Sequence, residues 1–149
     1  MKVVFILGSK VDMDHAEKMT KPLHSEWGIA VEVIVASAHK VPRVVADLVE
    51  KNNSLEDLVY VTIAGRSNAL SGVVAANSLH PVFACPPFAD KVDMMVNLNS
   101  TLMMPSETPV ITVIDPSNTV LAIARVFALK DAAVRAKVEK RMADVKASF

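Results

Sequence analysis

The sequence contains only one cysteine, Cys85, among 149 residues, so no disulfide can form within a single chain. Its N-terminus lacks the charged region, apolar run and small-residue cleavage site of a secretory signal. No stretch reaches about 18 uninterrupted apolar residues, and no basic amphipathic helix with aromatic anchors is present. We therefore expect a reduced, cytoplasmic protein that does not associate with membranes.

The chain also lacks an excess of charge, because 16 Lys and Arg residues balance 16 Asp and Glu residues. A protein that neutralises several phosphates of DNA or RNA needs a positive excess, so we expect no nucleic-acid partner. No second cysteine or suitably spaced histidine completes a metal-ligand set, and we expect no metal. One Trp, one Tyr, five Phe and no G-x-G-x-x-G sequence also disfavour a flavin or nicotinamide cofactor.

Apolar side chains are abundant, at 52% of the residues, and suffice for the core of one domain. Short runs rich in β-branched residues are typical of buried parallel strands, and they lie at 3–7, 31–36, 59–64, 82–85 and 110–115. Segments with helical spacing alternate with them, at 12–27, 42–51, 69–78, 91–99 and 117–129. This alternation predicts an α/β three-layer sandwich with a flavodoxin-like five-stranded parallel sheet.

Two helical stretches at the end of the chain suggest an oligomer. Residues 120–129 are apolar except for Arg125, so we expect this segment to be buried. Residues 130–145 carry a thin apolar stripe that suits packing against one neighbour, formed by Val134, Val138, Met142 and Val145. We therefore expect one α/β domain over 1–129, with 130–149 as its C-terminal helix, in a homo-oligomer. The alternative is that both helices pack on the sheet of their own chain.

Ligands of doubly wound folds bind beyond the carboxyl ends of the strands, and polar loops follow the first three expected strands. The first loop, Gly-Ser-Lys-Val-Asp at 8–12, places Ser9 at a helix N-terminus, where free N–H groups and the helix dipole favour a phosphate. Ordinary helix capping by Ser9 or Asp12 is the alternative.

The second loop, Ser37-Ala38-His39-Lys40, sets an imidazole beside a cation and a hydroxyl. With an ordinary pKa near 6.5, an imidazole gives and takes protons at cellular pH, so this loop could hold an anion and move a proton. A purely structural role for His39 is the alternative. The other three histidines fall within or at the ends of helical segments, where this role is less expected: His15, His24 and His80.

The third loop, Gly65-Arg66-Ser67-Asn68, combines backbone N–H groups with a guanidinium, a hydroxyl and an amide, and could hold a second anion or a carbonyl. The alternative is a turn whose glycine permits positive φ and in which Ser67 or Asn68 caps the next helix. Three such loops at three successive strand ends favour a functional site. The Cys85-Pro86-Pro87 sequence after the fourth strand is interpreted as structural.

With these loops in this order, the chain resembles the phosphoribosylaminoimidazole carboxylase (AIR carboxylase) family of purine biosynthesis from its first strand to about residue 129. Pro105 after a methionine and the helix at Asn118 also fall where that family places them. The family has two classes, and this chain is similar to the second in its third loop and in the lysine, Lys40, that follows His39. Enzymes of the second class carboxylate aminoimidazole ribonucleotide directly with CO2. The first class, which rearranges an N-carboxylated ribonucleotide, has Ala-Gly-Ala-Gly-Gly-Ala and an arginine at these places.

This resemblance implies a reversible, ATP-independent carboxylation without a cofactor, in a tetramer or octamer. His39 would be the general acid and base. The 5′-phosphate would be held by Ser9, Ser37, Lys40 and Ser67, the ribose by Asp12, and the base or developing carboxylate by Gly65, Arg66 and Asn68. Family members often carry a second serine where this chain has Val11. The alternatives are a mutase of the first class and a non-catalytic module that binds a nucleotide or phosphosugar.

Overall fold

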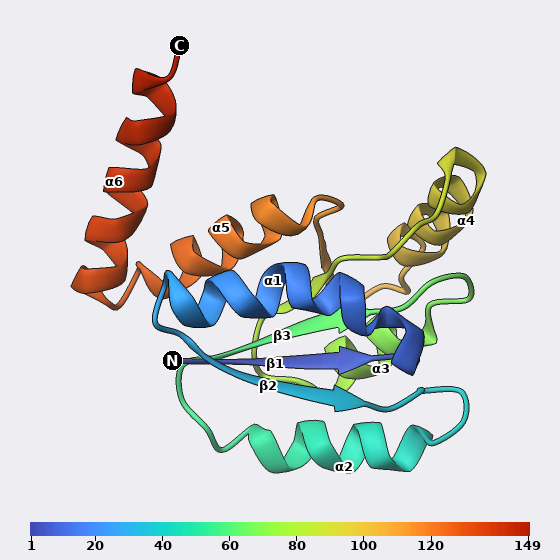
Figure 1. The fold of residues 1–149 in the computed structure, drawn as a ribbon. Coiled ribbons are helices and arrows are strands. Elements are labelled where there is room, and N and C mark those ends of the chain that lie inside the picture. The colour runs from blue at the N-terminus through green and yellow to red at the C-terminus, as the bar shows by residue number, and fades with distance from the viewer.

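The five β-branched runs form one parallel sheet in a computed structural model that describes all 149 residues (Figure 1). Its strand order is β2-β1-β3-β4-β5, the flavodoxin-like order, so the predicted fold class is confirmed. The strands are β1 (Lys2–Leu7), β2 (Ala30–Val35), β3 (Leu58–Ile63), β4 (Val82–Ala84) and β5 (Ile111–Thr112).

Helices follow the strands as the spacing predicts. A short 3-10 turn, η1 (Lys10–Asp12), leads into α1 (Met13–Ser25), and the remaining helices are α2 (Pro42–Asn52), α3 (Ala69–Asn77), α4 (Lys91–Leu102), α5 (Pro116–Phe127) and α6 (Ala132–Ala147). Gly28 has a φ of +70° just after α1, the left-handed conformation that commonly ends a helix. No helix has the length and apolar character needed to span a membrane.

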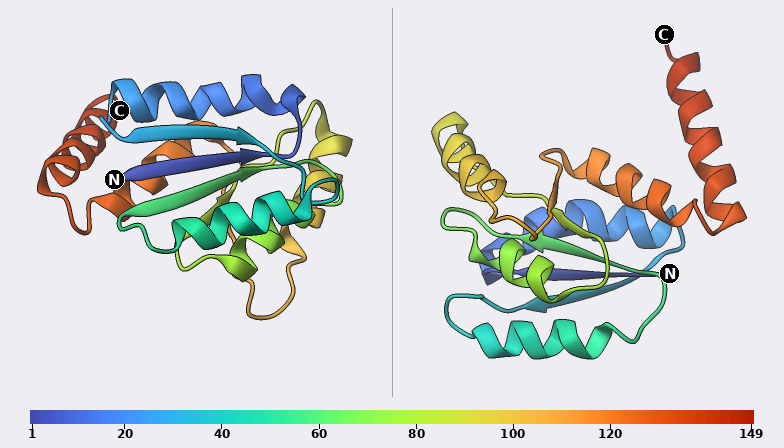
Figure 2. Two further views of the ribbon diagram at one scale, coloured as in Figure 1. Left: turned by 90° about the horizontal axis from the view of Figure 1, so that it is seen from below. Right: turned by 180° about the vertical axis from the view of Figure 1, so that it is seen from behind.

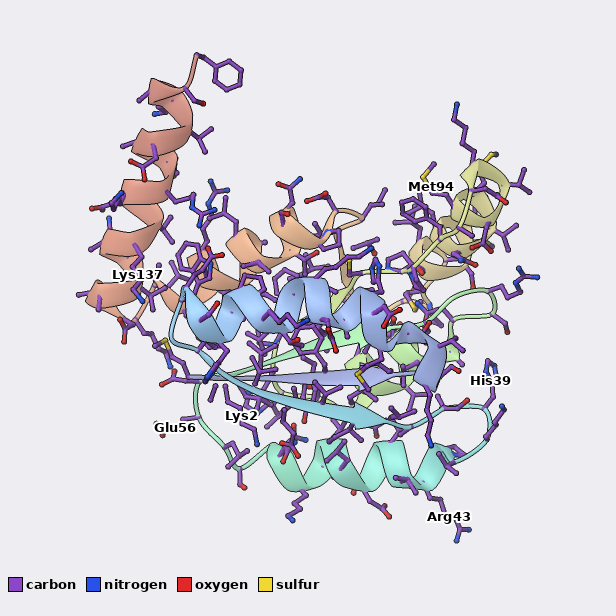
Figure 3. The ribbon with its side chains drawn as sticks, viewed as in Figure 1. Lys2, His39, Arg43, Glu56, Met94 and Lys137 are labelled. Carbon is purple, nitrogen blue, oxygen red and sulfur yellow. The ribbon has the colours of Figure 1, made fainter.

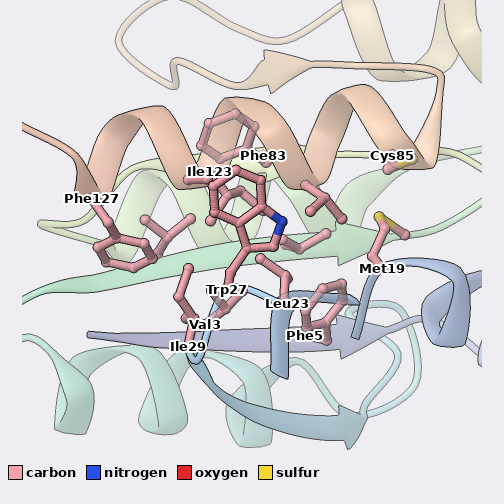
Figure 4. Packing of buried hydrophobic residues seen from close by; sticks show 14 of the residues in the cluster. Val3, Phe5, Met19, Leu23, Trp27, Ile29, Phe83, Cys85, Ile123 and Phe127 are labelled. Carbon is pink, nitrogen blue, oxygen red and sulfur yellow. The ribbon is translucent and has the colours of Figure 1, made fainter. Parts of the chain in front are cut away.

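Two hydrophobic cores sandwich the sheet. Successive residues of β1 point to opposite faces, so that Val3 and Phe5 enter one core while Val4 and Ile6 enter the other. The first core packs the sheet against α1 and α5, with Trp27 and Ile123 among its members (Figure 4). The second packs the sheet against α2 and α3. Both faces of the central strands β1 and β3 are covered, so the polar loops emerge at the ends of the strands. The expected burial of residues 31–36 needs correction, because β2 is an edge strand in which Val33 and Val35 are exposed.

Two expectations about the second half of the chain need correction. The predicted fifth strand over 110–115 is reduced to Ile111–Thr112, because β5 is an edge strand paired only with the short β4. Residues 120–129 are not buried throughout: α5 ends at Phe127, and Leu129 beyond it is 83% exposed. The buried face of α5 packs within its own chain, against α1 and the sheet, as the alternative interpretation expected.

The last helix, α6, projects away from the sheet (Figures 1 and 2). Val134 and Val138, in its first half, are buried in the first core, whereas Met142 and Val145 are exposed. Lys137, labelled in Figure 3, donates to the backbone oxygens of Glu26 and Trp27 at 3.0 and 3.1 Å, at the end of α1. The root of α6 is therefore fixed to the body, and its outer half is not covered by this chain.

The two adjacent valines of α2 test the described packing. Val45 is completely buried in the second core, whereas Val44 is 53% exposed. We expect Val45→Ala to lower the free energy of unfolding by about 2 kcal/mol, because buried methyl groups are lost and a cavity remains. The matched Val44→Ala variant should lie within about 0.5 kcal/mol of the parent. Urea denaturation measures both, and equal losses would contradict the assigned faces of α2.

Candidate functional site

The functional loops meet where the chain reverses direction in the sheet. From β1 the chain crosses to β2 on one side, and β3 then returns to the other side of β1. At the ends of these neighbouring strands, the Gly8 N–H donates to the Ile63 carbonyl at 2.9 Å. Beyond this point the loops separate around a cavity of about 610 Å³. The site lies at the switch point where doubly wound sheets bind ligands.

Most of the sequence-predicted residues share this cavity. Its wall includes Ser9, Asp12, Ser37, His39, Gly65, Arg66 and Ser67. Lys40 and Asn68 are not part of the wall. Three loops that lie far apart in the sequence therefore converge as expected, and two of the nine predicted residues stand outside the cavity.

The first loop is held by a reciprocal pair of hydrogen bonds. The Ser9 hydroxyl accepts from the Val11 N–H at 3.4 Å, and the Asp12 carboxylate accepts from the Ser9 N–H at 3.0 Å. Burial raises the pKa of the Asp12 carboxyl, and the Ser9 hydrogen bond opposes this effect. The capping role foreseen for Ser9 is confirmed, and both side chains still face the cavity.

His39 stands at the arrowhead end of the sheet and is directed toward the loop after β3 (Figure 3). Its Nε2 atom lies 3.5 Å from the Ser67 hydroxyl oxygen, at the outer limit of a hydrogen bond. Ser67 has a φ of +58°, a left-handed conformation that is uncommon for a residue with a side chain. The imidazole is exposed, so it can exchange protons with solvent as well as with a ligand.

The third loop offers unpaired backbone donors. None of the hydrogen bonds formed outside the helices and strands uses the N–H group of Gly65, Arg66 or Ser67. Successive free N–H groups next to a left-handed residue are suited to an anion or a carbonyl oxygen. The Arg66 guanidinium is held 3.2 Å from the Asp93 carboxylate, which comes from α4. Arg66 therefore lies on the wall with its charge partly compensated.

The two predicted residues outside the wall have different surroundings. Asn68 is buried and caps α3, with its Oδ1 accepting from the Ser71 N–H at 3.1 Å. Its Nδ2 donates to the Thr101 hydroxyl at 3.0 Å, so protein groups occupy both ends of the amide. The alternative interpretation of Asn68 as a helix cap is thus confirmed. Lys40 is exposed on the turn next to His39.

Several wall residues were not predicted as site residues, including His15, which the sequence analysis set aside, and Pro87, which it interpreted as structural. They are His15 and Lys18 on α1, Pro87, Phe88 and Ala89 after β4, and Asp93 and Asn97 on α4. Positions 15 and 18 follow Asp12 at helical spacing and share its face, a signal that could have revealed them. No sequence pattern indicated that α4 would line the cavity. Its polar residues contact a loop about thirty positions earlier in the chain, and such a contact leaves no local pattern in the sequence.

His15 contacts the only cysteine, which the sequence analysis interpreted as structural. Its Nε2 atom lies 3.4 Å from the Cys85 sulfur. Burial raises the pKa of the Cys85 thiol to about 11, so the sulfur is neutral at cellular pH and a poor nucleophile. Burial and then the charge of Lys18 lower the pKa of His15, which favours the neutral imidazole. Next to the Lys18 cation, this part of the wall therefore carries a neutral imidazole.

The chemistry open to the cavity follows from its charges. Lys18 is a cation on the wall that forms no ion pair, whereas Arg66 is paired with Asp93. Together with free N–H groups and the hydroxyls of Ser9, Ser37 and Ser67, these cations can hold an anionic ligand. His39 supplies a group that can move a proton. No three His, Cys, Asp or Glu side chains are grouped so that they could hold a metal ion.

Comparison with known proteins places this chain in a family. The family model described as AIR carboxylase matches residues 2–148. A phosphoribosylaminoimidazole carboxylase of Archaeoglobus fulgidus is 46% identical over 138 residues, which cover 93% of this chain and 75% of that protein. The crystal structure of Treponema denticola PurE superposes with a TM-score of 0.90 at 35% identity, covering 99% of this chain and 92% of the other.

A third relative carries a different name. The N5-carboxyaminoimidazole ribonucleotide mutase of Methanocaldococcus jannaschii is 40% identical over 138 residues, covering 91% of this chain and 85% of that protein. The family thus includes proteins named for two related reactions on aminoimidazole ribonucleotides. The family model spans nearly the whole sequence, and the fold agrees with that of Treponema denticola PurE. The chain belongs to the AIR carboxylase family of purine biosynthesis.

Proposed function

We propose that the protein is the direct carboxylase: it joins aminoimidazole ribonucleotide and CO2, without ATP, to form the 4-carboxylated ribonucleotide, and it also catalyses the reverse reaction. The observation that carries this proposal is the position of His39, whose imidazole borders a cavity rich in anion-binding donors. A proton carrier beside such donors is what carboxylation of an electron-rich ring requires.

The reaction needs one proton carrier. The enamine-like carbon of the ring attacks the carbon of CO2, and a C–C bond forms while one C–O π bond becomes a carboxylate. The same ring carbon then loses its proton to the neutral imidazole of His39, which restores aromaticity. The exposed imidazolium returns the proton to solvent. In the reverse direction His39 protonates the ring carbon, and CO2 departs.

The rest of the wall would bind and orient the substrate. Ser9 and Ser37 come from the loops after β1 and β2, and their hydroxyls would contact the 5′-phosphate. Asp12 would accept from the ribose hydroxyls, since its carboxylate keeps unused acceptor positions beside Ser9. Lys40 would add charge at the rim, where its flexible side chain can reach a phosphate.

The loop after β3 would contact the base. Gly65 allows the backbone to approach the ring closely, and the free N–H groups of Arg66 and Ser67 would stabilise the developing carboxylate. The Ser67 hydroxyl, 3.5 Å from the His39 Nε2 atom, would contact the 5′-phosphate. Asn68 would not contact the ligand. It would support this loop by capping α3.

Direct carboxylation is preferred over the mutase reaction because of the Arg66-Ser67-Asn68 sequence in the third loop. The specific observation that keeps the mutase as a second candidate is the mutase name of the Methanocaldococcus jannaschii relative. A non-catalytic nucleotide-binding module is the remaining alternative, and an imidazole on the cavity wall argues against it.

We further propose that the protein works as a homo-oligomer, a tetramer or octamer, in the reducing cytoplasm. The exposed outer half of α6 supports assembly, because Met142 and Val145 continue the apolar stripe begun by Val134 and Val138. The single free and buried thiol fits a reducing compartment.

An ATP-free assay tests the proposed reaction. We expect the purified chain to carboxylate aminoimidazole ribonucleotide with dissolved CO2, at a rate that saturates with CO2 and is followed by ultraviolet absorbance. Rearrangement of the N-carboxylated ribonucleotide, without direct carboxylation, would assign the protein to the mutase class. Inactivity with both substrates, together with tight ribonucleotide binding, would favour the binding module.

His39→Asn tests the proton carrier. We expect kcat to fall by about 100-fold or more, because asparagine cannot carry the proton, while ribonucleotide affinity stays within several-fold of the parent. The matched control is His24→Asn, which changes an exposed histidine on α1 outside the cavity and should leave kcat and KM unchanged. A His39→Asn variant with full turnover would refute the assignment.

Light scattering tests the assembly. We expect a mass of four or eight chains at micromolar concentration, and Val145→Asp should shift the protein toward smaller species, because a charge would enter the apolar stripe of α6. A mass of one chain for the unchanged protein would exclude the proposed oligomer.

A further inference from the structure

The backbone of the loop after β3 is anchored at both ends and free in between. At its start, the Ile63 carbonyl accepts from the Gly8 N–H at 2.9 Å. At its end, the Asn68 N–H donates to the hydroxyl oxygen of Ser100, on α4, at 2.7 Å. The N–H groups of residues 65–67 form no hydrogen bond with the rest of the backbone. Ser100 therefore holds the first fixed N–H group after three free donors.

This backbone needs an anchor because it adopts two uncommon conformations in succession. Ser67 has a φ of +58°, a left-handed conformation that costs free energy in a residue with a side chain. Asn68 follows as the centre of an inverse γ-turn, with φ −72° and ψ 74°, closed by the Ala69 N–H, which donates to the Ser67 carbonyl at 2.8 Å. Conformations of this kind persist where surrounding contacts fix them.

Ser100 makes its contact from a helix that is itself held firmly. Asn97, one turn earlier on α4, donates through Nδ2 to the Pro87 carbonyl at 2.7 Å. Thr101, the next residue, accepts from the Asn68 Nδ2 at 3.0 Å. Both side chains are buried, so water does not compete with these hydrogen bonds. Ser100 is not part of the cavity wall, and any effect on a ligand must pass through the loop.

We propose that Ser100 is a positioning residue for the reaction. By accepting the Asn68 N–H, its hydroxyl keeps Ser67 left-handed and keeps the free donors of residues 65–67 in their places on the cavity wall. This inference rests on the proposed function, in which these donors stabilise the developing carboxylate. Without the hydroxyl, Ser67 and Asn68 can relax toward commoner conformations, and the donors move with them.

The effect should fall on the chemical step more than on ribonucleotide binding. A carboxylate develops only after the ring carbon attacks CO2, so donors aimed at this group act mainly in the transition state. The 5′-phosphate keeps its contacts with Ser9 and Ser37, which lie on the other two loops and do not depend on α4. Loss of the Ser100 hydroxyl should therefore lower kcat and change the affinity for the ribonucleotide much less.

The variant Ser100→Ala tests the proposal in the ATP-free assay. We expect kcat to fall by about tenfold, the effect of one lost hydrogen bond in the transition state, while the affinity for aminoimidazole ribonucleotide, measured by calorimetric titration, stays within about threefold. Ser100→Thr keeps the hydroxyl and should restore kcat to within about twofold of the parent. The matched control is Asn99→Ala, at the exposed neighbouring position, which should leave both quantities unchanged.

Two further measurements distinguish positioning from support of the fold. Hydrogen exchange over residues 64–70, followed by mass spectrometry, should be faster in Ser100→Ala than in the parent, because the Asn68 N–H loses its acceptor. Urea denaturation reports whether the variant is folded. If the alanine variant does not fold, Ser100→Cys, whose sulfur is only a weak acceptor, should show the same loss of kcat.

The outcomes separate this inference from the proposed function. If the loop exchanges faster in Ser100→Ala but kcat is unchanged, or if kcat and affinity fall equally, Ser100 only supports the fold, and the inference is wrong while the proposed function stands. If the parent protein does not carboxylate aminoimidazole ribonucleotide, the proposed function fails, and the inference fails with it. A lower kcat with nearly unchanged affinity, restored by threonine, is the result that a purely structural role would not produce.

Discussion

The close approach of the ends of β1 and β3 is the constraint on which the site depends. Gly8 and Ala64 follow the two strands, and a Cβ atom on Gly8 would lie only 3.5 Å from the Ala64 Cβ atom. Because the crossovers on either side of β1 run in opposite directions, the loops after β1, β2 and β3 must open around this contact. The fold thereby brings the serines and His39 to one cavity from segments that are not neighbours in the chain.

Binding and proton transfer use different parts of the wall. Loops contribute the free N–H groups and His39, whereas helices contribute the side chains that hold those loops, such as Asp93 beside Arg66. This division suits a reaction whose chemistry is mostly that of the substrate. The ring supplies the electrons for carboxylation, so the protein needs to orient it, stabilise charge and accept one proton.

The sequence predicted the parts of the structure that local patterns determine. Alternating β-branched runs and helical spacing located the sheet, and the three polar loops located the cavity. It could not predict that α4 would supply part of the wall, because the pairing of Asp93 with Arg66 spans 27 positions and no local period encodes it. The exposure of Leu129 was missed for a related reason: a helix-like apolar run does not show where the helix stops. An asparagine at position 68 could cap a helix or bind a ligand, and the sequence does not distinguish the two roles. Only the hydrogen-bond partners of Asn68 in the structure show that it caps a helix.

The contact of Lys137 with the end of α1 links the two extremes of the chain. The carbonyls of Glu26 and Trp27 receive their donor from a residue about 110 positions later. During synthesis the first strand and helix leave the ribosome long before α6, so the carbonyls at this end of α1 must rely on water until α6 has been made. Helix α6 thus completes the hydrogen bonding of a helix end that the earliest segment of the chain begins.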